Sequence, residues 1–329
     1  MLMHSQEINS LLNLRADRSH GWGESTRGQA PHKPFLLLSI LDGIDQGWIS
    51  DNRIELSQEL VDSFFTYWNA VMGEDQVTTI ALPFFYMKSE PFWELAYKEG
   101  EKKYKSSPSL GGLKNRVEYA VINPGLFNLM ENPVERQKIR KLLADHYFSK
   151  DTAEKVLEIG TFNRQAMEYS NEVESMAAEP FIPFQKDKKK RKVVTRYAQV
   201  REAGFSTAVR KNYDQSCAVC RSRLVTPGGQ TLVEGAHIIP WSESNNDDPR
   251  NGLSLCRSHH WMFDKMMLTI RDDYTIRLSY WLERNDNSVE ETVDLKNRQI
   301  LLPENDRYFP STEALLYHND RFEHFHKEN

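Results

Sequence analysis

GAHIIPWSESNNDDPRNGLSLCRSHHWMFDK, residues 235–265, gathers an unusual share of the reactive side chains of this 329-residue chain. It holds three of the ten histidines, one of the three cysteines and several carboxylates, placed around the apolar runs HIIPW and NGLSL. Short apolar runs separated by turn residues are typical of a β-hairpin. We expect this hairpin to be followed by a helix that carries HHWMFDK.

The three cysteines and one histidine form two short pairs. Cys217-x-x-Cys220 is followed, after 35 intervening residues, by Cys256-x-x-His259. Each pair lets two ligands point at one ion while the backbone turns around it, and four such ligands hold Zn²⁺ in a tetrahedral site. Because every cysteine is used, this interpretation is favoured over scattered buried cysteines. The predicted zinc ion is structural, since four protein ligands leave no open position.

A second group of polar residues surrounds the predicted turn. His260 follows the zinc ligand His259, but on a helix it points about 100° away from it. Asp264 lies one turn further along on the same face, so the two side chains can share a hard divalent ion such as Mg²⁺ or Mn²⁺. A hairpin followed by a helix would also bring His237 and Asn251 close to His260. The alternatives are a buried structural histidine for His237 and a surface carboxylate for Asp264.

At these positions the sequence resembles the HNH endonucleases, which have the ββα-metal fold. His237, Asn251 and His260 match the three motif residues at spacings of 14 and 9, and the resemblance covers residues 196–282. It implies metal-dependent hydrolysis of DNA. His237 would deprotonate a water molecule, Asn251 would fix the orientation of His237, and His260 with Asp264 would hold the catalytic Mg²⁺ or Mn²⁺.

One position departs from the family pattern. Many members have an aspartate or histidine metal ligand directly before the base histidine, whereas this chain has Ala236. Glu234, two residues earlier on the same strand face, or Asp264 could supply the missing ligand.

The first half of the chain reads as mainly helical. HKPFLLLSILDGIDQGW has Pro34 in a first turn, and LSQELVDSFFTYWNAVM has Ser57 as a helix N-cap. Residues 77–97, interrupted by Pro83 and Pro91, predict turns and brief strands. The composition shifts near residue 180 to a proline-punctuated and then basic stretch. We therefore predict a DNA-reader domain at 1–180, a basic linker at 181–195 and a nuclease domain at 196–329.

The segments RGQAPHKPFLLLSIL and ALPFFYMKSEPFWEL resemble the sulfur-binding domain of type IV restriction enzymes that cut phosphorothioate-modified DNA. The resemblance covers about residues 15–165. It implies that Leu82, Pro83 and Phe84 form an apolar cup for the sulfur and that His32 and Lys33 are a basic pair beside the DNA backbone. The family often has a tyrosine before the proline, where Leu82 keeps the apolar character but lacks the hydroxyl. The alternatives are core packing for Pro83 and Phe84 and an exposed helix start for His32 and Lys33.

The net charge of −5 conceals charge segregation along the chain. Residues 186–223 contain 12 Lys and Arg against 3 Asp and Glu, whereas residues 272–329 contain 7 against 13. A basic stretch beside the predicted hairpin suits a polyanion, although a solvated linker has the same composition. Arg201 and Arg210 would either contact phosphate or lie on a solvated helix face.

Together these features predict an α+β protein with a mainly helical N-terminal reader and a zinc-stabilised ββα-metal nuclease domain. The expected function is modification-dependent restriction of double-stranded DNA that carries phosphorothioates. The alternatives are an HNH endonuclease targeted to another modification or to a plain sequence, and a non-catalytic DNA-binding module that keeps the zinc fold. A homodimer would supply two active sites for double-strand cleavage. The absence of a long apolar run and the low cysteine content predict a soluble, cytoplasmic protein with no membrane partner.

Overall fold

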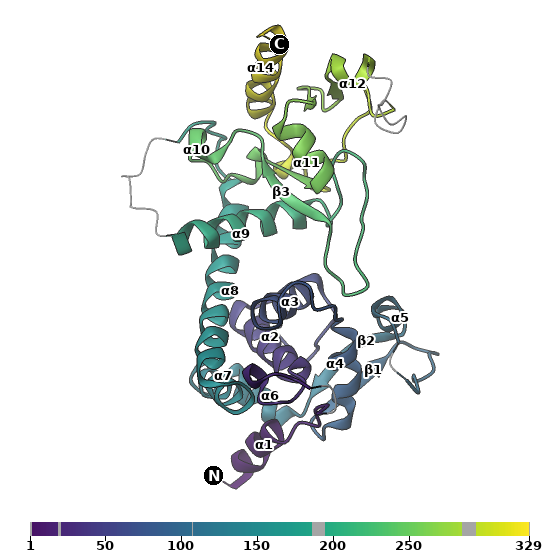
Figure 1. Ribbon diagram of the computed structural model, residues 1–329, viewed down its shortest axis with the longest axis vertical. Helices are drawn as coiled ribbons and strands as arrows, with labels where there is room; N and C mark the ends of the chain where they lie inside the picture. The colour runs from purple at the N-terminus through teal and green to yellow at the C-terminus, as the bar shows by residue number, and fades with distance from the viewer. Residues whose placement is uncertain (1, 19–20, 107, 186–194, 285–293, 329) are drawn as a thin grey trace. The chain divides into compact units, whose positions relative to one another are not determined.

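The computed structural model describes residues 2–18, 21–106, 108–185, 195–284 and 294–328 (Figure 1). The chain divides into two compact units, one of residues 1–164 with 225–230 and one of residues 165–224 with 231–329. The division falls inside the helix α8 (Lys150–Met176). The predicted domain limits at 180 and 195 stay predictions, and residues 186–194 of the predicted linker lie outside the described residues.

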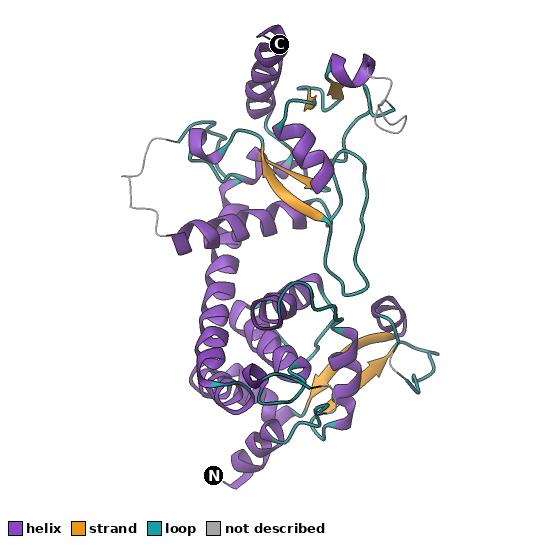
Figure 2. Cartoon of the chain, viewed as in Figure 1, coloured by secondary structure: helices purple, strands orange, loops and turns teal. Residues whose placement is uncertain are grey.

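The first unit is mainly helical and carries one small sheet. Its elements are α1 (Leu2–Leu12), η1 (Glu24–Thr26), α2 (His32–Gln46), α3 (Gln58–Met72), α4 (Ala81–Tyr86), η2 (Met87–Ser89), β1 (Trp93–Tyr97), α5 (Leu110–Arg116), β2 (Val117–Ile122), α6 (Pro124–Glu131), α7 (Pro133–Tyr147) and the first part of α8. The strands β1 and β2 pair antiparallel, with Trp93 opposite Ile122. The expected helical character of this half is confirmed (Figure 2).

Local sequence signals explain where several of these helices begin. The Ser57 side chain accepts a hydrogen bond from the backbone N–H of Leu60 and caps α3, as expected. The helix α2 ends at Gly47, whose φ of 80° suits glycine. Residues 81–86 form α4 rather than a strand, so the expectation of turns and brief strands holds only from Trp93 onward. Pro83 is tolerated because it lies in the first turn of α4, where a backbone N–H would have no helical partner.

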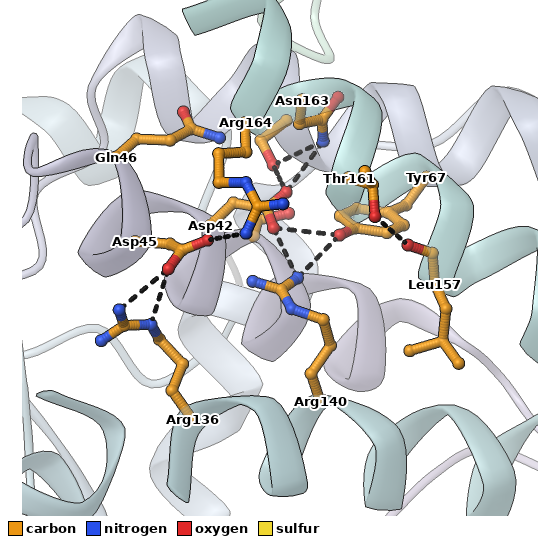
Figure 3. A network of polar contacts seen from close by, with 12 residues as sticks. Asp42, Asp45, Gln46, Tyr67, Arg136, Arg140, Leu157, Thr161, Asn163 and Arg164 are labelled. Carbon is orange, nitrogen blue, oxygen red and sulfur yellow. Dashed lines mark hydrogen bonds and ion pairs between the residues drawn. The ribbon is translucent and has the colours of Figure 1, made fainter. Parts of the chain in front are cut away.

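A buried polar network connects the helices of the first unit (Figure 3). Asp42 is 1% exposed, and its Oδ1 atom lies 2.5 Å from Nη1 of Arg140. The hydroxyl of Tyr67 and the amide of Asn163 donate to the same carboxylate at 3.1 and 2.8 Å. Burial raises the pKa of Asp42, and the charge of Arg140 opposes that rise. Because the four side chains come from α2, α7, α3 and α8, the network fixes these helices against one another.

The second unit contains the predicted hairpin and helix. Its elements are the end of α8, α9 (Thr195–Asn212), β3 (Val233–His237), α10 (Trp241–Ser244), η3 (Pro249–Asn251), β4 (Gly252–Cys256), α11 (Arg257–Asp264), β5 (Leu268–Ile270), β6 (Ile276–Leu278), α12 (Tyr280–Arg284), η4 (Asp306–Tyr308) and α14 (Thr312–Glu328). The strands β3 and β4 pair antiparallel, with His237 opposite Gly252 and Val233 opposite Cys256. The expected order of hairpin and helix is confirmed, and so is the mixed helix and strand class of the protein.

The helix α9 packs directly on the β3–β4 hairpin. A Cβ atom at Gly235 would lie 2.7 Å from Cα of Ser206, and one at Gly252 would lie 2.5 Å from Cγ2 of Val209. Only glycine permits this approach of helix and strand backbones. The hydroxyl of Ser206 also accepts a hydrogen bond from the N–H of Gly235 at 2.9 Å. The hairpin therefore has α9 on one face, while Glu234 on its other face contacts α11.

None of the helices in the described ranges combines the length and apolar character that a membrane span requires.

Candidate active site and metal centre

The four predicted zinc ligands converge. The ligand atoms of Cys217, Cys220, Cys256 and His259 all lie within 4.8 Å of one another. Nδ1 of His259 is 3.0 Å from Sγ of Cys256 and 3.6 Å from Sγ of Cys217. Ligands of a tetrahedral zinc ion are about 3.5 Å apart, given zinc–ligand bonds of roughly 2.0–2.3 Å. The cluster can therefore hold a metal ion, and three sulfurs with one imidazole are a donor set that suits Zn²⁺.

Local structure positions these ligands. Cys217 and Cys220 lie in the turn that follows α9, Cys256 ends β4, and His259 lies in the first turn of α11. A hydrogen bond from the Cys217 thiol lowers the pKa of both Cys220 and Cys256. Thiolates are the form in which cysteine binds metals. The same hydrogen bonds raise the pKa of Cys217, so the three thiols share their protons unequally. The cluster thus joins three segments of the second unit.

His237 occupies the last position of β3. Its ring stacks on Phe205 of α9 with a centroid distance of 3.7 Å and an angle of 7° between the planes. Its Nε2 atom lies 2.8 Å from Oδ1 of Asp247, and 16% of the side chain is exposed. The ring is therefore held on two sides yet still reaches the surface of the unit.

Asn251 is fully buried and bonds only backbone groups within the described contacts. Its Oδ1 atom accepts a hydrogen bond from the N–H of Ile239 at 2.9 Å, and its Nδ2 atom donates to the carbonyls of Ile239 and Asn246 at 3.0 Å each. Ile239 lies two residues beyond His237. The amide therefore fixes the chain as it leaves β3, which is the geometry expected of a positioning residue.

His260 lies between two carboxylates. Its Nδ1 atom is 3.3 Å from Oε2 of Glu234, and its Nε2 atom is 3.6 Å from Oδ2 of Asp264. Ala236 is 1% exposed and lies on the same strand face as Glu234. An ion bound to His260 through one ring nitrogen can share only the carboxylate at that nitrogen. Glu234 and Asp264 are thus alternatives in this arrangement, and Glu234 is the nearer.

A family model described as HNH endonuclease matches residues 217–271. The chain carries an HNH endonuclease domain. HNH endonucleases are metal-dependent enzymes that cut DNA, so the expected nuclease character and DNA substrate are supported at the level of the family. The match begins at Cys217, the first cysteine of the cluster, and includes the whole β3–β4–α11 segment.

One solved structure with similarity to the chain is described as "Modification dependent TagI restriction endonuclease". The similarity covers 37% of this chain and 38% of that chain, with 23% sequence identity and a TM-score of 0.29. The chain thus matches well under half the length of that protein. No curated protein matches the chain.

The HNH domain contains a carboxylate that the sequence pattern did not single out. Asp247 is 4% exposed, and besides His237 it contacts Nη1 of Arg201 at 2.6 Å and the hydroxyl of Tyr169 at 2.6 Å. Burial would raise the pKa of Asp247, but the hydrogen bond with His237 and the charge of Arg201 outweigh it and hold that pKa below its usual value. Asp247 is therefore ionised at neutral pH.

The two arginines of α9 make contacts within the domain, and for Arg201 these differ from both expectations. Arg201 neither faces solvent nor is available to phosphate, because it binds Asp247 and only 11% of its side chain is exposed. Its guanidinium also lies over the Trp241 ring, 4.1 Å from the centroid. Arg210 donates to Oγ1 of Thr231 at 3.1 Å, so it too is engaged within the domain.

The first unit contains a pocket of about 440 Å³ at the predicted sulfur cup. Four of the five predicted residues line this pocket: His32, Lys33, Leu82 and Pro83. Phe84 does not line it, because its ring is fully buried and packs edge-on against Trp93 at 5.3 Å. For Phe84 the structure therefore shows the core packing that was the alternative expectation.

Seven further residues line this pocket and were not expected from the sequence: Arg15, Ala16, Asp17, Trp22, Ala30, Tyr86 and Ser89. Arg15 and Asp17 are both exposed, and they bring a positive and a negative charge to the pocket. Tyr86 lies one helical turn after Leu82 and supplies a phenol near the position where the family often has a tyrosine. Only the short spacing between Leu82 and Tyr86 could have indicated from the sequence that Tyr86 lines the pocket.

The predicted basic pair carries little net charge. Burial lowers the pKa of His32 to about 4 against the opposing charge of Asp17, so the ring is neutral at pH 7. Its Nε2 atom is 3.0 Å from Oγ1 of Thr78. The ammonium of Lys33 is buried and lies 2.5 Å from Oε1 of Glu90. His32 and Lys33, taken together with Glu90, thus carry little net charge, unlike the basic pair beside the DNA backbone that the family resemblance implies.

The choice between Glu234 and Asp264 gives a testable expectation. We expect Glu234→Gln to raise the Mn²⁺ concentration for half-maximal DNA cleavage by about tenfold or more, as loss of a ligand carboxylate does. Asp264→Asn should leave that concentration within about twofold, since one ring nitrogen binds one ion. The measurement is a Mn²⁺ titration of the cleavage rate. The opposite pattern would assign the ion to the Nε2 side of His260.

Proposed function

We propose that the chain is a modification-dependent restriction endonuclease, in which the first unit reads phosphorothioate-modified double-stranded DNA and the HNH domain cuts nearby. The observation that carries the proposal is the convergence of His32, Lys33, Leu82 and Pro83 on one pocket of a unit that accompanies an HNH domain. The proposed domains are 1–180 and 196–329, joined by the basic stretch between them.

The pocket has the chemistry that separates sulfur from oxygen. Leu82, Pro83 and Trp22 give it apolar walls. A phosphorothioate sulfur is poorly hydrated, whereas the oxygen of an ordinary phosphate would lose its water there without gaining a partner. Such a loss costs about 1–3 kcal/mol, which corresponds to roughly 10-fold to 100-fold in affinity. Arg15, at the same pocket, can pair with the remaining negative charge.

The HNH domain would supply the hydrolysis. His237 takes a proton from the attacking water, and Asn251 holds the chain beside it. A divalent ion, Mg²⁺ or Mn²⁺, would be held by His260 with Glu234 or Asp264 and would supply charge neutralisation at the phosphate. The four-ligand cluster at Cys217 would hold Zn²⁺ as a structural ion. The intact positions of His237, Asn251 and His260 favour this enzyme over a non-catalytic DNA-binding module.

The test compares two duplexes that differ only in one phosphorothioate of natural stereochemistry. With Mn²⁺, the wild type should cut the sulfur duplex at least about tenfold faster than the oxygen duplex. The variant Leu82→Ser, at a residue that is 37% exposed, should bring the two rates together by making the pocket wall polar.

Val77→Ser is the matched control, because Val77 is 96% exposed and is not part of the pocket lining. It should keep the preference for sulfur. Equal cutting of both duplexes by the wild type would refute the sulfur reader and leave the nuclease in place.

A second candidate reads a modified base instead of the backbone. The pocket of about 440 Å³ is larger than one sulfur atom requires, and Trp22 and Tyr86 are aromatic side chains of the kind that stack on an extruded base. Competition between a methylated duplex and a phosphorothioate duplex for binding to the full chain separates the two functions. Native mass of the DNA complex would show whether the predicted homodimer forms.

A further inference from the structure

The carboxylate of Asp247 is the centre of a buried polar cluster beside the candidate base. Its Oδ1 atom lies 2.8 Å from Nε2 of His237 and 2.6 Å from Nη1 of Arg201, and its Oδ2 atom accepts a hydrogen bond from the Tyr169 hydroxyl at 2.6 Å. Three donors that converge on one buried carboxylate fix its position and favour its ionised form.

The loop that carries Asp247 is itself held on both sides. Asn246 is fully buried; its Oδ1 atom accepts a hydrogen bond from the N–H of Asp248 at 2.8 Å, and its Nδ2 atom donates to the carbonyl of Ile182 at 3.0 Å. The carbonyl of Asn246 accepts from Nδ2 of Asn251 at 3.0 Å. Asn251, which fixes the chain after the end of β3, therefore also fixes the loop that carries Asp247.

These contacts determine which nitrogen of His237 is basic. An ionised carboxylate only accepts hydrogen bonds, so the neutral His237 ring must carry its proton on Nε2, the atom that faces Asp247. Nδ1 then holds the lone pair. The stacking of the ring on Phe205, at 3.7 Å, prevents it from tilting away from this orientation.

We infer that Asp247 is a positioning residue for the hydrolysis, which holds His237 in the tautomer whose Nδ1 accepts the proton of the attacking water. This inference rests on the proposed role of His237 as the base. In the step, the water oxygen bonds to phosphorus, the bond from phosphorus to the 3′ oxygen breaks, and one water proton passes to Nδ1. The 3′ oxygen takes a proton from solvent. The negative charge of Asp247 stabilises the imidazolium that forms.

Histidine side-chain nitrogen NMR of the isotope-labelled full chain tests the tautomer without any need for substrate. The His237 signals are assigned by their loss in His237→Gln, and spectra are recorded at a pH where the ring is neutral. We expect the wild-type ring to be protonated on Nε2. In Asp247→Ala no acceptor faces Nε2, so the ring should populate both neutral tautomers. Cleavage of the phosphorothioate and plain duplexes with Mn²⁺ should fall by about 100-fold or more, with unchanged DNA binding. The variant should melt at a lower temperature, because Arg201 loses its buried partner, so all measurements are made below that temperature.

The matched control is Asp248→Ala, because the Asp248 side chain bonds Arg250 instead of His237. It should leave the ring of His237 in the Nε2–H form, as in the wild type. An Asp247→Ala variant that stays wholly in the Nε2–H form, or that cuts at the wild-type rate, overturns the inference. If His237→Gln also cuts like the wild type, the base role of His237 is wrong as well. An inactive His237→Gln beside an active Asp247→Ala refutes the role of Asp247 alone.

Discussion

Replacing His237 by alanine or glutamine should reduce DNA cleavage by about 1,000-fold, within the range of roughly 10²–10⁴ that a general base contributes. The reason is that neither side chain can take the proton of the attacking water. Single-turnover cleavage of the phosphorothioate duplex with saturating Mn²⁺ measures the chemical step. Binding of the same duplex should change by less than about twofold, because the proposed reader lies in the other compact unit.

The two variants separate chemistry from structure. Glutamine keeps an N–H that can donate to Asp247, which otherwise retains Arg201 and Tyr169 as partners. His237→Gln should therefore melt like the wild type. His324→Ala, at an exposed residue of α14, is the control for loss of a histidine in the same unit and should keep full activity. A His237→Gln variant that cuts within about tenfold of the wild type would mean that another group is the base.

The features predicted most completely from the sequence are those made by local geometry. Two ligand pairs with two-residue gaps can converge where their turns lie side by side. The N–H of Ala218 donates to the carbonyl of Ser254 at 2.7 Å, so the turn with Cys217 and Cys220 lies beside β4. The hairpin and helix follow from short apolar runs and a turn. The sequence pattern therefore predicted the cluster of three cysteines and one histidine, the hairpin and the placement of Asn251 beside the end of β3.

Asp247 could not be singled out because its partners are distant in sequence. Arg201 is 46 residues away and Tyr169 is 78 residues away, so the cluster exists only after α8 and α9 pack on the hairpin. The expectation that Arg201 contacts phosphate or faces solvent was wrong for the same reason. The order of residue types along the chain does not show which cationic side chain will pair with a buried carboxylate.

The pocket of the first unit shows a similar limit. The motif predicted four lining residues, but the charge state of His32 depends on burial against Trp22 and Trp68, whose rings lie 5.6 and 4.6 Å from it. The pairing of Lys33 with Glu90 spans 57 residues. Phe84 was assigned to the cup because the sequence does not state which side of α4 faces the core.

Loss of the cysteine cluster should unfold the HNH domain while the first unit remains folded. Zinc binding to such sites is worth about 10–16 kcal/mol in small zinc domains, which matches or exceeds the total stability of a typical domain. Cys217 and Cys256 are also buried within the hydrophobic core of the second unit. We expect Cys256→Ser to lose bound zinc and all measurable cleavage, as judged by metal analysis and single-turnover assays.

The design of this experiment separates the structural ion from the catalytic one. Metal analysis and melting are carried out without Mg²⁺ or Mn²⁺, so that only the structural site contributes. Ser258→Ala is the matched control, because Ser258 lies between the ligands Cys256 and His259 with its side chain exposed and should leave the zinc content unchanged. Phosphorothioate binding should persist in Cys256→Ser, because the first unit has its own hydrophobic core. A metal analysis that finds no zinc in the purified wild type would refute a structural zinc ion. So would a Cys256→Ser variant that melts and cuts like the wild type. Joint loss of binding and cleavage would instead show that the two units fold as one cooperative structure.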